Sequence, residues 1–200
     1  MQKLTPLEPG KYYHIYNRGI NRENIFFEER NYHYFLRLYA RHCAPVAETF
    51  AYCLMRNHFH LLARIREVAD LRGFENPEGL NPEGRTTQAF SNCFNAYAKA
   101  INKAYGRTGS LFQHRFGRVE VDSDRYFAAL VRYIHFNPQK HGFVEDFRTY
   151  PYSSYAAFLT DHPTRLNRAA VLDWFGGAAQ FVEAHAQPPD ETNRYAPEDD

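Results

Sequence analysis

The sequence predicts an α+β fold with a ferredoxin-like (split βαβ, RRM-like) antiparallel sheet, helices on one face of that sheet, and one added helix after the last strand. Two observations support this fold class. Apolar residues recur with period two in some stretches and at three- and four-residue spacing in others, and these stretches follow in the order β-α-β-β-α-β-α. The chain has 200 residues, of which 44% are hydrophobic, and this suffices for a single sizeable core.

The first half of the chain supplies a strand, a helix and a hairpin. Residues 11–18 (KYYHIYNR) alternate with period two and predict the first strand. Apolar positions over residues 29–42 recur with helical spacing, so an amphipathic helix follows. Residues 48–55 and 58–65 are two β-rich runs separated by only two residues, which predicts an antiparallel hairpin.

The next part of the chain begins with a loop or insertion near residues 66–85, which is rich in Pro, Gly and acidic residues. A helix with its N-cap at Thr86 or Thr87 is expected to run to about Tyr105. Residues 110–122 then form a fourth extended segment.

The added helix is predicted over residues 125–137, and Pro138 should terminate it because proline has no N–H to donate. We expect residues 1–160 to form one domain and residues 161–200 a C-terminal extension. This extension should hold a short helical segment near Trp174 and a disordered acidic tail.

Cysteine usage and hydropathy indicate a protein of the reducing cytoplasm. Cys43, Cys53 and Cys93 are odd in number, lack C-x-x-C spacing and lie among apolar residues, which predicts buried free thiols. No window approaches the roughly 18 consecutive apolar residues of a membrane span, and the first residues lack the apolar stretch of a secretion signal. We therefore expect a cytoplasmic protein that has no membrane partner.

The charge of the chain is polarised although its sum is close to zero. The 24 Lys and Arg residues nearly balance 23 Asp and Glu residues, for a formal net charge of +1. Residues 85–141, however, hold nine basic and three acidic residues, and residues 142–200 hold four basic and ten acidic ones. Such a basic segment suits a polyanion partner such as nucleic acid, although a charged run also occurs on ordinary solvated surfaces.

The motif His58-Phe59-His60 lies on a predicted strand, where residues two apart face the same way. Two neutral imidazoles that project together form half of a metal site, although paired histidines also occur as ordinary hydrogen-bonded residues. Asn137 offers a third ligand, because it follows Tyr133 by four residues and so shares its helix face.

These residue types together suggest a phosphoryl-transfer reaction. A tyrosine hydroxyl is a poor nucleophile at neutral pH unless a positive centre stabilises the phenolate or polarises the electrophile. A divalent ion with open positions could bind the nonbridging oxygens of a phosphodiester and polarise it. Attack by Tyr133 on the phosphorus would then give a phosphotyrosine link and a free 3′ hydroxyl.

The sequence resembles a known family at these residues: the HUH single-tyrosine transposases, and within them the REP-associated tyrosine transposases of bacteria. The matching pieces cover about residues 11–158 in the family's order: YHIYNRG, IFFEERNYHYFL, LMRNHFHLL, GSLFQHRF, YIHFNPQKHGFV and YPYSSY. Two features depart from the pattern, namely Arg56 before the Asn-His pair and the Pro/Gly-rich stretch at 73–84.

The resemblance implies that residues 1–160 form an HUH single-tyrosine transposase catalytic domain. Carried over by position, it makes His58 and His60 the metal-binding pair, Tyr133 the nucleophile and Asn137 the third ligand. It also implies Mg²⁺ or Mn²⁺ as the cofactor and single-stranded or hairpin DNA as the partner, cleaved at hairpin-flanked (REP-like) sites through a 5′-phosphotyrosine intermediate. The chain could act as a monomer or as a homodimer.

Further residues near the proposed site could contact DNA. The candidates for phosphate contacts are Arg18, Arg115, Arg118 and Arg132. The candidates for stacking on unpaired bases are Phe112, Phe116, Tyr12 and Tyr16. Tyr97 and Tyr126 also lie on predicted helices, but apolar residues at i+4 indicate that they pack in the core rather than react.

Two other function classes fit the same residues. A metal-dependent hydrolase would use the paired histidines to activate water, without a covalent intermediate. A non-catalytic nucleic-acid-binding protein on the same fold would need neither the histidines nor Tyr133.

Overall fold

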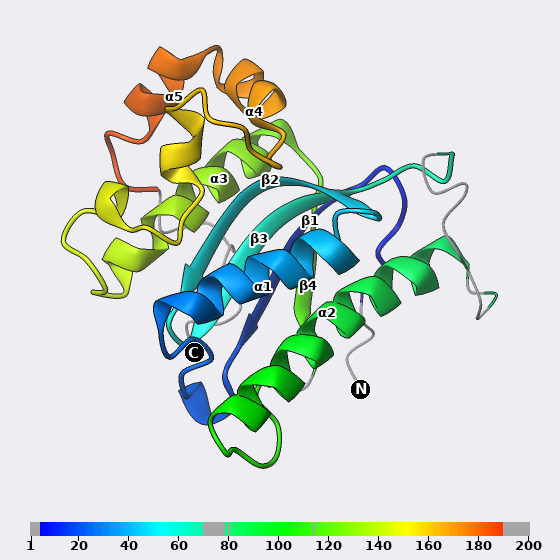
Figure 1. The fold of residues 1–200 in the computed structure, drawn as a ribbon. Coiled ribbons are helices and arrows are strands. Elements are labelled where there is room, and N and C mark those ends of the chain that lie inside the picture. Colours follow the sequence, from blue (N-terminus) through cyan, green and yellow to red (C-terminus); the bar gives the residue numbers. More distant parts are fainter. Residues whose placement is uncertain (1–4, 70–78, 80, 114, 190–200) are drawn as a thin grey trace.

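The computed structural model describes residues 5–69, 79, 81–113 and 115–189 (Figure 1). The predicted order β-α-β-β-α-β-α is confirmed, and two short helices follow it. The elements are β1 (Tyr12–Arg18), α1 (Glu29–His42), β2 (Ala47–Met55), β3 (His58–Ile65), α2 (Pro82–Ala104), β4 (Gly117–Val121), α3 (Asp124–Lys140), α4 (Arg168–Phe175) and α5 (Ala178–Ala184).

The four strands form one sheet in the order β2-β3-β1-β4, and every neighbouring pair is antiparallel. Helices α1 and α2 lie together on one face, whereas α3, α4 and α5 lie on the other (Figure 1). Tyr13 and Ile15 pack in a core with α1 and α2, and Leu62 packs in a second core with α3. The ferredoxin-like prediction is therefore confirmed, and the added helix covers the opposite face of the sheet.

Strand β2 lies at the edge of the sheet, and a loop after α3 pairs with it. Leu54 N donates to the carbonyl of Tyr152, and Ser154 N donates to the carbonyl of Tyr52. The Tyr150 hydroxyl donates to the carbonyl of Leu54. Because these contacts satisfy backbone groups that an edge strand leaves open, they attach the chain after α3 to the sheet.

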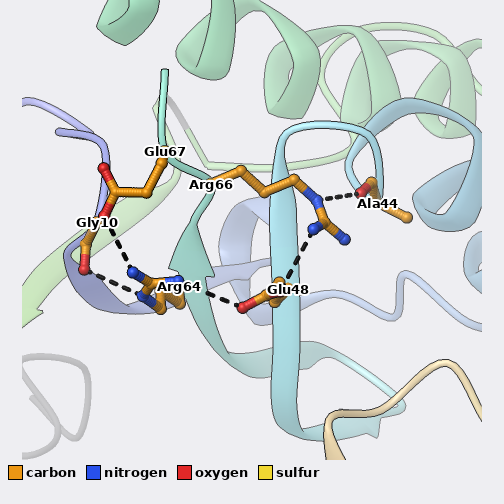
Figure 2. A network of polar contacts seen from close by, with 6 residues as sticks. All are labelled: Gly10, Ala44, Glu48, Arg64, Arg66 and Glu67. Atoms are coloured by element: carbon orange, nitrogen blue, oxygen red, sulfur yellow. Dashed lines mark hydrogen bonds and ion pairs between the residues drawn. The ribbon is translucent and has the colours of Figure 1, made fainter. Parts of the chain in front are cut away.

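The open end of the β2–β3 hairpin is held by a network of ion pairs and hydrogen bonds (Figure 2). Arg64 and Arg66 both approach the Glu48 carboxylate, at 3.6 Å and 3.3 Å. The same two guanidinium groups donate to backbone carbonyls, Arg64 to Gly10 and Arg66 to Ala44. The network therefore connects the segment before β1 and the end of α1 to the hairpin, at the end of the sheet opposite the hairpin turn.

Helix α2 begins earlier than the sequence analysis predicted. Its N-cap is Asn81, whose side chain accepts a hydrogen bond of 2.8 Å from Gly84 N, and Pro82 follows at the first helical position. The prediction of Thr86 or Thr87 as N-cap was wrong because proline suits a first helical turn, where its missing N–H costs nothing. Residues 70–78 and 80 of the predicted insertion lie outside the described residues.

Helix α3 continues through Pro138 to Lys140, so the prediction that this proline terminates the helix was wrong. Proline removes only the hydrogen bond that its own N–H would have made to Ile134, four residues earlier. His141 N still donates to the carbonyl of Asn137 over 3.0 Å, which closes a further turn. Asn137 therefore lies within the helix rather than at its end.

Other expectations concern the cysteines, the C-terminal region and the membrane. All three cysteines are buried and free, as predicted. Two helices, α4 and α5, occupy the region near Trp174 where one short helix was expected. The acidic tail from residue 190 onward lies outside the described residues. Within the described ranges, no helix is long and apolar enough to cross a membrane.

A buried chain of hydrogen bonds joins α5 to α3 and to β2. His185 Nδ1 donates to the carbonyl of Phe181 (2.7 Å), so a neutral His185 can accept at Nε2 from His135 Nδ1 (2.9 Å). His135 Nε2 then accepts from the Ser154 hydroxyl (2.8 Å), whose oxygen accepts from Tyr52 N. Every donor and acceptor in this series of hydrogen bonds has a partner only when the imidazoles of His135 and His185 are both neutral.

This arrangement predicts that the protein loses stability in mild acid. Burial lowers the pKa of His185 from 6.5 to about 4. Below pH 6.5 the unfolded chain takes up a proton at this imidazole, whereas the folded chain does so only near pH 4. The contribution of neutral His185 to the free energy of unfolding is complete above pH 6.5. It is lost as the pH falls towards 4, and the loss amounts to up to about 3 kcal/mol.

Urea unfolding at pH 7, 5.5 and 4.5 measures this loss for the wild type and for His185→Gln. The glutamine oxygen can still accept from His135, but the side chain does not titrate. The wild type should lose more free energy of unfolding across this interval than the variant does. Equal losses in the two proteins would contradict the assignment to His185.

Candidate functional site

The register between β1 and β3 gathers polar residues on one face of the sheet. Tyr16 lies opposite His60 and Arg18 lies opposite His58, while His14 is two residues before Tyr16. Cross-strand partners and alternate residues share a face, so all five side chains lie on the face that α3 covers. The intervening residues point towards α1 and α2.

His58 begins β3 directly after the hairpin turn and is almost fully buried. Its Nδ1 lies 2.7 Å from Oδ1 of Asn57, in the turn itself. An amide oxygen only accepts, so Nδ1 carries the hydrogen and the lone pair of the neutral ring lies on Nε2. This is the tautomer that a metal ligand requires, and the neighbouring amide is an outer-shell partner of the usual kind.

His60 is also buried, and its Nδ1 lies 2.9 Å from Nε2 of His14. Its ring stands nearly perpendicular to that of His58, with 5.2 Å between the centroids. Burial, and secondarily the charges that His14, His58 and other groups would carry, holds the pKa of His60 well below its usual value. Burial alone lowers the pKa of His14 to about 3. Both rings are therefore neutral near pH 7.

One face of α3 covers the paired histidines. The Tyr133 ring lies 5.5 Å from the His60 ring, and the His141 ring lies 4.8 Å from the His58 ring. Asn137 is four residues from Tyr133 and from His141, the residue that caps the C-terminus of α3, and so occupies the turn between them. The structure thus places the four residues that the sequence predicted for the chemical site on two elements that face each other, His58 and His60 on β3, Tyr133 and Asn137 on α3.

The two polar atoms of the Asn137 side chain differ, because one is hydrogen-bonded and the other is not. Its Nδ2 donates to the carbonyl of Tyr133 over 2.9 Å, which fixes the orientation of the amide. Its Oδ1 is buried and has no hydrogen-bond partner among the residues described. A buried amide oxygen without a donor is costly unless something else coordinates it.

Two imidazoles and an amide oxygen fit a divalent ion with open positions for water and substrate. The described part of the chain holds no group of three or more His, Cys, Asp or Glu residues that could bind a metal, so a site with three protein ligands here would have to include the Asn137 oxygen. This mixed nitrogen and oxygen set favours Mn²⁺ over Mg²⁺, because Mg²⁺ prefers oxygen ligands alone.

The four candidate arginines fall into two groups. Arg18 lies on the site face opposite His58, and Arg115 is exposed in the loop before β4 with a backbone φ of 60°. Arg118 lies opposite Ile15 and therefore points to the other face, where it donates to the Thr87 hydroxyl over 3.1 Å.

Arg132 immediately precedes Tyr133 on α3, but its guanidinium is directed to the C-terminal region. Its Nη2 donates to the carbonyls of Gln187 and Pro188, at 2.8 Å and 3.0 Å. Arg118 and Arg132 thus hold parts of the chain together, whereas Arg18 lies on the face of the site and Arg115 is exposed in the loop before β4.

The candidate aromatic residues also differ in access. Phe112 and Phe116 are buried in the core of α1 and α2 and are closed to nucleic-acid bases. Tyr12 packs edge-on against Trp174. Tyr16 is only half-buried, and its ring lies 4.9 Å from that of His14, so it remains the aromatic candidate at the site.

The alternative tyrosine on α2 packs as predicted. Tyr97 is fully buried, and its hydroxyl donates to the carbonyl of Ile25 over 2.8 Å.

Three further residues lie near the site without a role predicted from the sequence, namely His14, His141 and Lys140. The Nζ of Lys140 lies 5.6 Å from the centroid of the Tyr133 ring. A signal for His14 was present, because the period-two alternation of KYYHIYNR already placed His14, Tyr16 and Arg18 on one face. In a split βαβ fold the first strand also lies next to the strand that carries His58 and His60.

Comparison with known proteins supports the family resemblance in sequence. Over 108 residues the chain is 31% identical to a Haemophilus influenzae protein that carries the name of a REP-associated tyrosine transposase. The match covers 54% of this chain and 58% of that relative, so the chain spans little more than half of the relative's length. No protein-family model matches the chain.

Among solved structures, the fold is similar to that of a REP-associated tyrosine transposase bound to a REP hairpin. The TM-score is 0.58 at 16% sequence identity, over 82% of this chain and 88% of the other. At this level of identity the similarity establishes a shared fold. The resemblance that the motifs indicated is thus confirmed: the chain is similar to REP-associated tyrosine transposases in sequence and in fold.

The position of the Tyr16 ring depends on a glycine. Gly117 lies directly opposite Tyr16, and a Cβ at this glycine would lie 2.1 Å from two carbons of the ring. Gly117→Ala should therefore lower the free energy of unfolding by about 1–3 kcal/mol. The same substitution in a Tyr16→Ala background should cost much less, because the clash needs the ring. Urea unfolding of the four proteins tests this, and an equal cost in both backgrounds would contradict it.

Proposed function

We propose that this protein is a metal-dependent single-stranded DNA endonuclease and strand transferase of the REP-associated tyrosine transposase type. The observation that carries the proposal is the Tyr133 ring of α3, which lies 5.5 Å from the ring of His60 in the His58–His60 pair, with Asn137 one turn further along the helix. A tyrosine, two imidazoles and a buried amide oxygen without a partner thereby lie on two elements that face each other. The similarity to REP-associated tyrosine transposases in sequence and fold supports the same function.

In the proposed reaction, the Tyr133 hydroxyl oxygen attacks the phosphorus of a DNA phosphodiester. The bond from phosphorus to the 3′ oxygen breaks, and the products are a 5′-phosphotyrosine and a free 3′ hydroxyl. The tyrosine loses its proton and the 3′ oxygen gains one, so the step is balanced. Since the phosphotyrosine link keeps the energy of the broken bond, a 3′ hydroxyl can later attack it and rejoin the strands without ATP.

The residues around Tyr133 have separate roles in this proposal. His58, His60 and Asn137 would hold a divalent ion, which supplies a Lewis acid that polarises the scissile phosphate. Tyr133 is held against His60 by α3, and its buried position limits access of water to the phosphotyrosine. Arg18 and Arg115 would bind backbone phosphates of an unpaired or hairpin DNA at the open edge of the site.

The fold argues against a sheet-type nucleic-acid-binding protein as the alternative. Domains of that kind expose one face of a four-stranded sheet, whose aromatic residues stack on bases. Here α3 covers the face that carries Tyr16 and the histidines, while α1 and α2 cover the other face (Figure 1). A function that depends on the edge of the sheet and on α3 fits this arrangement better.

The central test is Tyr133→Phe with labelled single-stranded hairpin DNA from the flanks of the gene, in Mn²⁺, Mg²⁺ or chelator. Wild-type protein should form a metal-dependent covalent adduct that survives a denaturing gel. Tyr133→Phe should form none while it still binds the DNA, because only the hydroxyl is lost. Tyr126→Phe, seven residues earlier on α3, is the matched control and should leave the adduct unchanged.

An adduct that survives in Tyr133→Phe would assign the nucleophile to another residue. Cleavage without any adduct would instead support the metal-dependent hydrolase.

The two groups of arginines predict different salt dependences of DNA binding. Arg115→Ala should lower the slope of log affinity against log salt concentration by about one, since it removes one phosphate contact. Arg118→Ala should leave the slope unchanged, because its guanidinium lies on the opposite face and bonds to Thr87. Fluorescence anisotropy with hairpin DNA, at salt concentrations from roughly 50 to 200 mM, gives both slopes. A change for Arg118→Ala alone would contradict the proposed DNA path.

A further inference from the structure

His14 is a fully buried histidine on β1 whose side chain has one hydrogen bond within the described residues, to a proposed metal ligand. Its Nε2 lies 2.9 Å from Nδ1 of His60, and the two rings are stacked with 5.1 Å between centroids and 27° between planes. Its Nδ1 is buried and has no hydrogen-bond partner among those residues. A polar side chain in this position satisfies only half of its own hydrogen-bonding capacity, so simple core packing does not account for it.

The hydrogen bond between the two rings decides whether His60 can bind a metal. One hydrogen lies between the facing nitrogens, because two hydrogens would clash and two lone pairs would repel. If His60 Nδ1 carries it, the lone pair of the neutral ring is on Nε2 and is available to a metal. If His14 Nε2 carries it, neutral His60 holds its own hydrogen on Nε2 and cannot act as a ligand through that atom.

We propose that His14 is a positioning residue whose Nε2 accepts the hydrogen of His60 Nδ1, and that it thereby holds His60 in the tautomer that ligates a metal through Nε2. This inference rests on the proposed function, since it concerns the same metal site. The other histidine of the pair has the matching arrangement, because the Asn57 amide oxygen accepts from His58 Nδ1. Each ligand ring thus has an acceptor at Nδ1, supplied by an amide in one case and by an imidazole in the other.

The arrangement also fixes the state of the open nitrogen of His14. When His14 accepts at Nε2, its own hydrogen lies on Nδ1, where the described residues offer no acceptor. In the proposed tautomer the fold carries one unsatisfied buried donor, at Nδ1 of His14. Outer-shell partners of this kind fix the ring and raise the basicity of the ligand, and their loss usually weakens metal binding about 10–100-fold.

Two substitutions separate the acceptor role of His14 from its packing. In His14→Gln the amide oxygen lies about as far along the side chain as Nε2, so it can accept from His60. In His14→Leu a side chain of comparable size offers no acceptor. Full-length, metal-free protein is titrated with Mn²⁺ alone, and a thermal unfolding curve confirms that each variant is folded.

We expect His14→Leu to weaken Mn²⁺ binding about 10–100-fold and His14→Gln to stay within about threefold of the wild type. A folded His14→Leu protein that binds Mn²⁺ as tightly as the wild type would overturn the inference. Equal losses in both variants would also overturn it, because packing rather than hydrogen bonding would then be the cause.

A second readout needs no metal. Long-range ¹H–¹⁵N NMR of metal-free protein distinguishes a hydrogen on Nδ1 of His60 from one on Nε2. Hydrogen on Nδ1 in the wild type and in His14→Gln supports the inference, and hydrogen on Nε2 overturns it. If the wild type shows the Nδ1 form but does not bind Mn²⁺, the proposed metal site fails while the role of His14 stands. This measurement also decides the question if His14→Leu does not fold.

Discussion

The antiparallel register between β1 and β3 is the constraint on which the rest of the site depends. It places Tyr16 opposite His60 and Arg18 opposite His58, and it sets the His14 ring against the His60 ring. A shift of one residue would turn every side chain of one strand to the other face, because side chains alternate along a strand. The hydrophobic residues between them lie in the core with α1 and α2 and oppose such a shift. Burial of the apolar face thus fixes the geometry of the polar one.

Helix α3 completes the site because it continues through Pro138, a residue type that often ends a helix. Pro138 removes one hydrogen bond, but the turn beyond it still closes through His141 N and the Asn137 carbonyl. Tyr133, Asn137 and His141 therefore keep a spacing of four residues along one face. The loop after α3 pairs with the edge of β2, and the buried chain of hydrogen bonds through His135 joins the same helix to α5. These contacts hold α3 against the sheet at a fixed distance.

Buried neutral imidazoles occur twice, and each time the orientation of their hydrogens follows from their partners. At His135 and His185, a backbone carbonyl at one end determines every donor in the chain. At His14 and His60, no such carbonyl is present among the described residues, and the direction of the hydrogen bond decides whether Nε2 of His60 carries a hydrogen. The first pair therefore serves stability, whereas the second is coupled to the site. Burial keeps the pKa of both pairs low, so neither carries a charge near neutral pH.

The order of the elements and the fold class followed from the amino-acid sequence alone. The four residues predicted for the chemical site lie on β3 and α3, and their chemical roles stay a prediction. Periodicity sufficed for β1, α1 and the β2–β3 hairpin, because local hydrophobic patterns reflect which face is buried. Periodicity failed at the start of α2, where Pro82 occupies the first helical position. It also failed at Pro138, where the helix continues through a residue type that often ends one. Contacts between distant parts of the chain place the guanidinium groups of Arg118 and Arg132 away from Tyr133 and set His14 against His60. These contacts join residues distant in the chain, and their geometry depends on strand register and helix packing, which no local pattern encodes.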